Sequence, residues 1–210
     1  MNRPVEIPPL ATENLLENTD GVLHHCSLGA AACYLLFMLT RYIDAGIVSQ
    51  AAPTTPPTVV LTPAAPAAAP PAAGGTHAGI THVYTTKGGR QLYMHFVAVH
   101  GLKPRATYHY VVQSGGADAK PSPPQAFHAL PDGTTATRIN IYGDLGVYEW
   151  NAMEWLKADC GPDAGSSAVD AIVHMGDHAY NEGDDDERRA DAYMNAFQPT
   201  LASCPWFPGK

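Results

Sequence analysis

The 210-residue sequence has few basic residues and no cluster of them. Twelve Lys and Arg stand against twenty Asp and Glu, which gives a formal net charge of −8. A protein that binds duplex nucleic acid needs grouped Lys and Arg for its phosphate contacts. The only adjacent basic pair, Arg188-Arg189, follows three aspartates and a glutamate. We therefore expect no nucleic-acid partner.

The sequence also lacks paired cysteine motifs. Its four cysteines, Cys26, Cys33, Cys160 and Cys204, show no CxxC spacing, which argues against a zinc knuckle or a thioredoxin-type site. The sequence leaves open whether Cys160 and Cys204 form a disulfide. It contains no N-x-S/T sequon, so glycosylation gives no sign of secretion.

No apolar run has the length of an ordinary membrane span. The apolar core of Val22–Thr40 is shorter than the about 18 to 20 residues that cross a bilayer. A signal peptide begins with a positive leader, whereas residues 1–20 are acidic. For this N-terminal segment, residues 1–50, two interpretations stay open. One is membrane anchoring through residues 22–40, as a signal anchor or an unusual secretory segment. The other is a buried helix or a poorly ordered start.

Prolines and alanines dominate residues 51–75, "AAPTTPPTVVLTPAAPAAAPPAAGG", with seven prolines. Such a composition favours extended polyproline geometry over a packed core. It predicts a linker or a long inserted loop.

Residues 76–131 consist of short runs rich in β-branched and aromatic residues, such as "QLYMHFVAV" and "ATYHYVVQ". Gly- and Pro-rich turns such as "KGGR" and "SGGADAKPSPP" separate these runs. Regular short strands separated by such turns are typical of an antiparallel β-sandwich. We therefore predict part of such a sandwich.

After Pro131 the pattern changes to alternating strands and helices, over residues 138–210. "TRINIYGDLG" and "DAIVHMGDHAY" predict strands, whereas "VYEWNAMEWLKADC" and "DDDERRADAYMNAFQPTL" predict helices. Acidic residues favour the first turn of the second helix because of the helix dipole. The alternation predicts a parallel sheet with right-handed crossovers, and a third strand would begin at "CPWFPGK".

Two aspartates follow the predicted strands at equivalent points. Asp144 in "YGDLG" and Asp177 in "MGDHAY" each come after a glycine, about one thirty-residue βαβ unit apart. The carboxyl ends of adjacent parallel strands are neighbours, and open α/β sheets bind ligands there. Two such close carboxylates need a cation or a proton between them. With the phenol of Tyr180 they suit a hard trivalent or small divalent metal; a plain polar turn is the alternative.

These motifs resemble those of the purple acid phosphatases, within the calcineurin-like metallophosphoesterases. "GDLG" at 143–146 and "GDHAY" at 176–180 match the family's first two motifs, GDxG and GDxxY. The upstream "GLKPRATYHYVVQSGG…FHALPDG" is similar to the fibronectin-III-like domain that precedes the catalytic domain in plant-type members. The resemblance covers residues 76–210.

The resemblance implies an α+β protein of several parts. A partial fibronectin-III-like β-sandwich at 76–131 would precede the first βαβα of a metallophosphoesterase α/β sandwich at 138–210. Asp144 would ligate a ferric ion, Fe(III), and Asp177 would bridge it to a second divalent metal, iron, zinc or manganese. Tyr180 would bind the ferric ion as a phenolate. His178 would be either an outer-shell contact to the substrate or a plain packed side chain.

The family's other ligands are not matched. Gly209 could be the glycine of the third motif, GNH(E/D), but Lys210 stands where the metal-binding Asn belongs. The VxxH and GHxH motifs have no counterpart, and strand alternation points His174 away from Asp177. We therefore expect an incomplete metal site and a sheet edge left open. We also expect a chain that alone is poorly stable, or that further residues complete.

The function that the resemblance implies is an acid phosphatase, which hydrolyses phosphate monoesters with a dinuclear metal centre in a secreted or acidic, lysosome-like setting. We expect this chain alone to be inactive. The alternative is a non-catalytic interaction protein that keeps the β-sandwich and a vestigial metal half-site. A nucleotidase or phosphodiesterase is disfavoured, because those relatives usually lack a tyrosine at the position of Tyr180.

Overall fold

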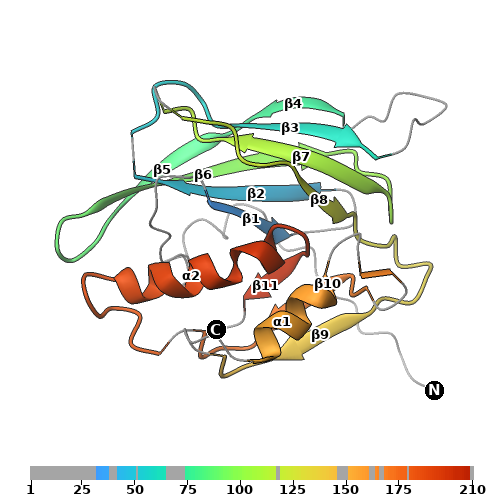
Figure 1. Cartoon of the computed structure of the whole chain (residues 1–210). Helices are drawn as coiled ribbons and strands as arrows, with labels where there is room; N and C mark the ends of the chain where they lie inside the picture. Colours follow the sequence, from blue (N-terminus) through green and yellow to red (C-terminus); the bar gives the residue numbers. More distant parts are fainter. Residues whose placement is uncertain are drawn as a thin grey trace, which may run out of the picture.

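In a computed structural model of the chain, the residues described are 32–37, 42–50, 52–64, 74–116, 119–145, 151–160, 164–165, 168–178 and 180–208. They form two β-sheets and two helices (Figure 1). The seven-stranded sheet contains, in spatial order, β5 (Ile80–Thr85), β6 (Gln91–His100), β2 (Tyr42–Ser49), β1 (Ala32–Phe37), β11 (Trp206–Pro208), β10 (Ala171–His174) and β9 (Ile139–Tyr142). The four-stranded sheet contains β4 (Gly75–Ala78), β3 (Thr58–Pro63), β7 (Thr107–Gln113) and β8 (Gln125–His128). The helices are α1 (Asn151–Ala158) and α2 (Arg188–Leu201).

The seven-stranded sheet is antiparallel in one half and parallel in the other. Strands β5, β6, β2 and β1 pair antiparallel, and β11, β10 and β9 pair parallel. The halves meet where β1 pairs parallel with β11, with Leu36 opposite Trp206. Strand β1 thus covers the side of β11 that faces away from β10. The parallel half ends at β9.

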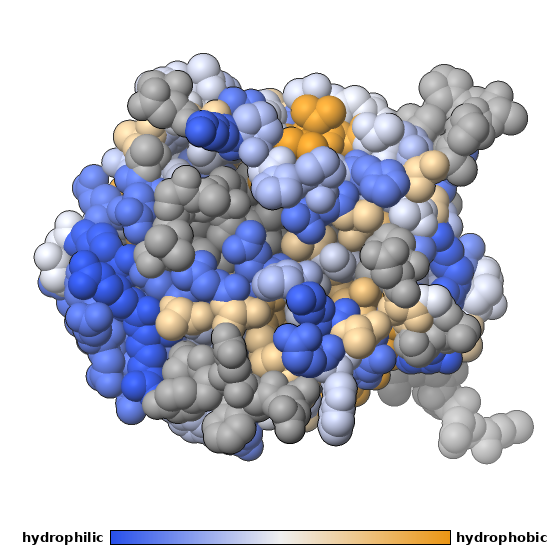
Figure 2. Space-filling view, viewed as in Figure 1, coloured by the Kyte–Doolittle hydropathy of each residue, from blue (hydrophilic) through white to orange (hydrophobic). Residues whose placement is uncertain are grey.

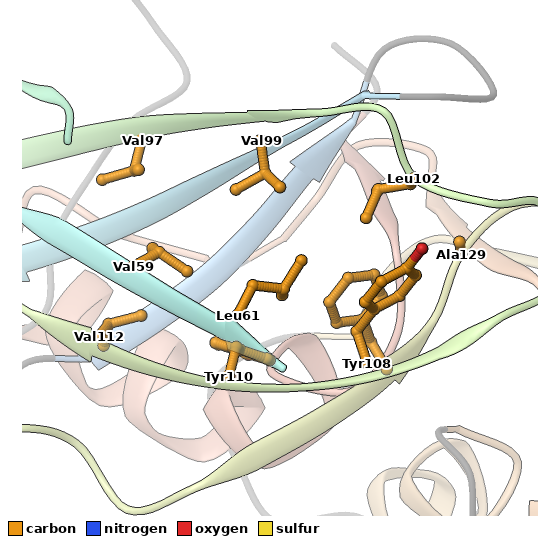
Figure 3. Packing of buried hydrophobic residues seen from close by; sticks show 10 residues of the cluster. Val59, Leu61, Val97, Val99, Leu102, Tyr108, Tyr110, Val112 and Ala129 are labelled. Atoms are coloured by element: carbon orange, nitrogen blue, oxygen red, sulfur yellow. The ribbon is translucent and has the colours of Figure 1, made fainter. Parts of the chain in front are cut away.

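One face of this sheet packs against the four-stranded sheet (Figure 3). Alternation along β6 turns Val97 and Val99 toward Val59 and Leu61 of β3. The rings of Tyr108 and Phe127 stack between the sheets, with centroids 5.6 Å apart. The short strands predicted within 76–131 are confirmed, and so is their packing as two sheets. The fibronectin-III-like character of this sandwich stays a prediction.

The opposite face of the seven-stranded sheet packs against α2. Tyr193, Phe197 and Leu201 recur at intervals of four along α2 and so share one side of the helix. They are buried against Ile172 of β10 and Trp206 of β11. The central sheet therefore lies between the second sheet and α2, as the layers of Figure 1 show.

Two sequence predictions for the N-terminal part are corrected. Within the predicted linker, residues 51–75, Thr58–Pro63 forms strand β3, and its Val59 and Leu61 are buried in the sandwich core. The alternation of "TVVLTP" outweighs the flanking prolines, which lie at the ends of the strand where no ladder hydrogen bond is lost. Within 22–40, Ala32–Phe37 is a strand rather than part of a helix; residues 22–31 and 38–40 lie outside the described residues.

The βαβα order predicted for 138–210 is confirmed, including the parallel pairing and the third strand at Trp206–Pro208. The second helix starts at Arg188, later than the acidic run predicts, because turns occupy residues 180–187. Neither helix described here has the length and apolar character needed to cross a bilayer.

Candidate metal centre

The two Gly-Asp turns lie side by side at the carboxyl edge of the parallel strands. Strands β9 and β10 pair with Tyr142 opposite His174, and the Met175 amide donates to the Tyr142 carbonyl at 2.7 Å. A Cβ on Gly143 would come 3.0 Å from the Met175 carbonyl oxygen. The close approach of the turns therefore favours glycine there.

Asp144 and Asp177 both adopt left-handed backbone conformations, with φ of 56° and 47°. This region is uncommon for residues other than glycine, although aspartate is enriched there. Both aspartates are exposed to solvent. Strained positions at a sheet edge are typical of functional sites, and each turn redirects its carboxylate out of the preceding strand.

Tyr180 is brought to the same place. Its hydroxyl donates a hydrogen bond to Oδ1 of Asp144, and 46% of its side-chain surface stays exposed. That bond, and then the negative charges of Asp144 and Asp177, raise the pKa of Tyr180 to about 12.

These three residues fit part of a hard-metal site. Two carboxylates and a phenol offer oxygen donors of the kind that Fe(III) prefers. Within the described parts of the chain, no group of three or more His, Cys, Asp or Glu side chains is placed to hold a metal. The donors present are thus two carboxylates and one tyrosine, and Gly209 and Lys210 of the third motif lie outside the described residues.

Two histidines pack directly behind the turns. His174, fully buried at the end of β10, shares a 2.7 Å hydrogen bond between its Nδ1 and the Tyr193 hydroxyl of α2. Burial, and then the neighbouring His178, lower the pKa of His174 to about 3. The ring is therefore neutral, and its Nδ1 faces Tyr193 of α2; that the ring points away from Asp177 stays a prediction.

His178 lies against the buried cluster. Its ring centroid is 4.2 Å from that of His174 and 5.9 Å from that of Trp206. Its Nε2 is buried and has no hydrogen-bond partner, and burial lowers its pKa. These contacts favour the packed side chain of the two alternatives, and an outer-shell role for His178 stays a prediction.

The β5–β6 hairpin contacts the segment that leads from Tyr180 into α2, an arrangement that the sequence did not reveal. Arg90 donates to Oδ2 of Asp191 at 2.5 Å and to the Asp186 carbonyl at 3.0 Å. The Gly88 amide donates to Oδ1 of Asp186 at 2.8 Å. Figure 2 shows hydrophilic side chains gathered on the side of the molecule where Figure 1 places this hairpin and the start of α2.

Two buried carboxylates belong to this contact. Asp191 is 1% exposed and Glu187 5% exposed, and Glu187 accepts a 3.1 Å hydrogen bond from Tyr84. The contact fixes the far end of the segment whose first residue is Tyr180. The feature of the sequence that indicated this contact was the acidic run "DDDE" at 184–187. This run has more acidic residues than a favourable interaction with the helix dipole requires.

Comparisons with known proteins agree with the motifs. No protein-family model matches the chain. It is 33% identical over 124 residues to the mouse protein "Acid phosphatase type 7" and 34% identical over 124 residues to the human protein of that name. Each match covers 58% of this chain and 27% of the relative. The chain thus spans about a quarter of the length of these curated relatives.

The fold has a counterpart among solved structures. The purple acid phosphatase PPD1 from yellow lupin (Lupinus luteus) seeds superposes with a TM-score of 0.67 at 18% sequence identity. The match covers 85% of this chain and 34% of the lupin chain. The chain is therefore purple acid phosphatase-like and corresponds to part of such a protein.

Proposed function

We propose that this purple acid phosphatase-like chain supplies Asp144, Asp177 and Tyr180 to a dinuclear metal centre that hydrolyses phosphate monoesters. The observation that carries the proposal is the hydrogen bond from Tyr180 to Asp144 beside the Asp177 turn. The name "Acid phosphatase type 7" of the relatives supports the reaction class.

In this proposal Asp144, Asp177 and Tyr180 would hold a ferric ion and a second divalent metal, iron, zinc or manganese. Bound metals of this kind supply Lewis-acid charge and lower the pKa of a coordinated water. The Tyr180 hydroxyl now keeps its proton on a bond to Asp144. Ligation by Tyr180 therefore releases that proton, so iron affinity should rise with pH.

The site of the 210 residues is incomplete in this proposal, because no segment matches the histidine ligands of the family's later motifs. We expect the purified chain to bind iron weakly and to leave p-nitrophenyl phosphate intact. A longer product that carries NH(E/D), VxxH and GHxH in frame after Lys210 should hydrolyse it. Robust metal-dependent turnover by the 210-residue chain would contradict this ligand assignment.

The test of the ligands is an Fe(III) titration followed by visible absorption, because an iron–phenolate bond gives a charge-transfer band. Tyr180→Phe should remove the band. Tyr93→Phe is the matched control, since the Tyr93 hydroxyl donates to Gln91 of the same strand, away from the site, and should leave the band unchanged. A band that survives in Tyr180→Phe would take Tyr180 out of the ligand set.

A second candidate is a non-catalytic interaction protein that keeps the sandwich and a vestigial half-site. It is favoured by the lack of a larger His, Cys, Asp or Glu group in the part of the chain that the structure describes. Sequencing the transcript past the Lys210 codon separates the two. A stop codon at that point supports the interaction protein, and the three later motifs in frame support the enzyme.

The finer assignments rest on the same resemblance. They are a fibronectin-III-like identity for the sandwich, with domains at 76–131 and 138–210, and a secreted or lysosome-like setting. Membrane anchoring through residues 22–40 is not proposed again, because Ala32–Phe37 is an internal strand of the seven-stranded sheet. Fractionation of cells that express the tagged chain tests the setting, and recovery from the cytosol alone would contradict it.

A further inference from the structure

Two cysteines that the proposed phosphatase chemistry does not use lie against each other. Cys160 follows α1, and Cys204 lies between α2 and β11. Both carry free, buried thiols in the same hydrophobic cluster, and the neighbouring Cys160 raises the pKa of Cys204. They lie before the amino ends of β10 and β11, whereas the Gly-Asp turns follow the carboxyl ends of β9 and β10.

The backbone around Val169 holds the two thiols together. The Val169 amide donates to the Asp159 carbonyl at 2.9 Å, which fixes the residue before Cys160. The Val169 carbonyl accepts from Sγ of Cys204 at 3.9 Å. Both thiols belong to the buried cluster with Ile172. Their proximity is thus part of the packed core rather than a chance surface contact.

We propose that Cys160 and Cys204 form a disulfide when the chain folds in the presence of a small-molecule disulfide. The bond would tie the end of α1 to the segment that enters β11. It would link two segments that now share only hydrogen bonds and apolar contacts, and it would do so apart from the metal centre.

The reaction balances as two exchange steps. The thiolate of Cys160, 7% exposed against 1% for Cys204, attacks the small disulfide and releases one small thiol. The thiolate of Cys204 then attacks the Cys160 sulfur and releases the second. Two protein thiols lose two electrons, and one small disulfide gains them. The neighbouring Cys160, and then burial, raise the pKa of Cys204, so the second step should be faster during folding than in the folded chain.

The experiment is peptide mapping of the full 210-residue chain after refolding with oxidised and reduced glutathione. Trypsin without reduction should release Ala158–Arg188, which carries Cys160, joined to Ala190–Lys210, which carries Cys204. Their combined mass should be about 2 Da below the sum of the free peptides. Cys26 and Cys33 share the peptide 1–41, so a link to either one would be recognised.

Glutathione on Cys160 alone, two unreacted thiols, or links to Cys26 or Cys33 would overturn the proposal. Thermal unfolding gives a second readout, because a cross-link constrains the unfolded chain. The oxidised chain should unfold about 10 °C above the reduced one. The difference should persist in Cys33→Ser and vanish in Cys160→Ser. If Cys160→Ser does not fold, the peptide map of the unmodified chain decides. Neither readout depends on phosphatase activity.

Discussion

The sandwich and the α/β part satisfy their buried polar groups differently. In the sandwich, fully buried His95 has both ring nitrogens hydrogen-bonded, to Ser49 and Thr81 at 2.8 Å each. Among the described residues of the sandwich, Nε of Arg90 is the one buried polar atom without a hydrogen-bond partner, whereas several described residues of the α/β part have such atoms. They are the Tyr142 hydroxyl, Nε2 of His174 and His178, and Nε1 of Trp206.

The difference shows which part of the core contains buried polar groups that are not hydrogen-bonded. Buried polar groups in stable structures are nearly all paired, and each exception calls for a cause. Here Tyr142 and His174 are the last residues of β9 and β10, directly before the two Gly-Asp turns. The unsatisfied atoms of Tyr142 and His174 thus lie next to the two Gly-Asp turns.

The largest expected effect comes from the contact that joins the two regions. Arg90→Met would remove the 2.5 Å ion pair that Arg90 makes with the Asp191 carboxylate, which is only 1% exposed. Removing one partner of a buried pair costs about 3–5 kcal/mol, a large fraction of the stability of an ordinary domain. Urea unfolding should show this loss, together with faster amide exchange in residues 180–187.

The matched control for Arg90 is Arg188→Met. Arg188 pairs with Asp185 at 3.9 Å, and both side chains are mostly exposed, so the change should cost less than about 0.5 kcal/mol. Adding Asp191→Asn to Arg90→Met should restore part of the stability, because it removes the buried charge that Arg90 neutralised. Equal stability of the Arg90 and Arg188 variants would show that the hairpin does not hold the two regions together.

The next effect is a pH dependence that originates in the sandwich. Burial lowers the pKa of His95 to about 4, whereas an unfolded histidine titrates near 6.5. Between these two pH values the His95 side chain binds a proton in the unfolded chain but not in the folded chain. The contribution of His95 to the free energy of unfolding should therefore fall by about 3 kcal/mol as pH drops from 6.5 to 4, and no further below 4. An acidic setting would weaken the sandwich at this residue.

The measurement is the urea midpoint as a function of pH in the original chain and in two variants. His95→Gln should make the dependence between pH 6.5 and 4 less steep, and the part that remains belongs to other buried histidines such as His174. His82→Gln, on the exposed face of the neighbouring strand β5, should leave the full dependence in place. A dependence as steep in His95→Gln as in the original chain would contradict the role of His95.

Removing two tyrosine hydroxyls should change the free energy of unfolding by smaller amounts, with opposite signs in the two regions. Tyr142→Phe removes a buried hydroxyl without a partner and should raise the free energy of unfolding by about 1 kcal/mol. Tyr110→Phe removes the hydroxyl that donates to the Ala202 carbonyl at 2.5 Å and should lower it by about 1 kcal/mol. Urea unfolding of both variants is the test. Destabilisation by Tyr142→Phe would mean that its hydroxyl has a partner and that the regions do not differ.

Features that depend on a short stretch of sequence could be predicted, whereas contacts between residues far apart in the chain could not. Alternation revealed the strands of the sandwich, and the repeated Gly-Asp pattern placed Asp144, Asp177 and Tyr180 at one edge before any coordinates. The linker prediction failed for Thr58–Pro63, because composition over twenty-five residues hid a short alternating strand. The pairing of β1 with β11 and of Arg90 with Asp191 joins residues far apart in the chain, and no local pattern specifies such partners.

The smallest expected change in stability belongs to the residue with the most specific proposed role. Tyr180 is 46% exposed, and its hydrogen bond goes to an exposed carboxylate. Tyr180→Phe should therefore change the free energy of unfolding by less than about 0.5 kcal/mol. Tyr193→Phe, which removes the buried bond to His174, should cost about 1–2 kcal/mol. If urea unfolding showed a larger loss for Tyr180→Phe than for Tyr193→Phe, Tyr180 would be a structural residue, and its exposed position beside two aspartates would no longer argue for a ligand.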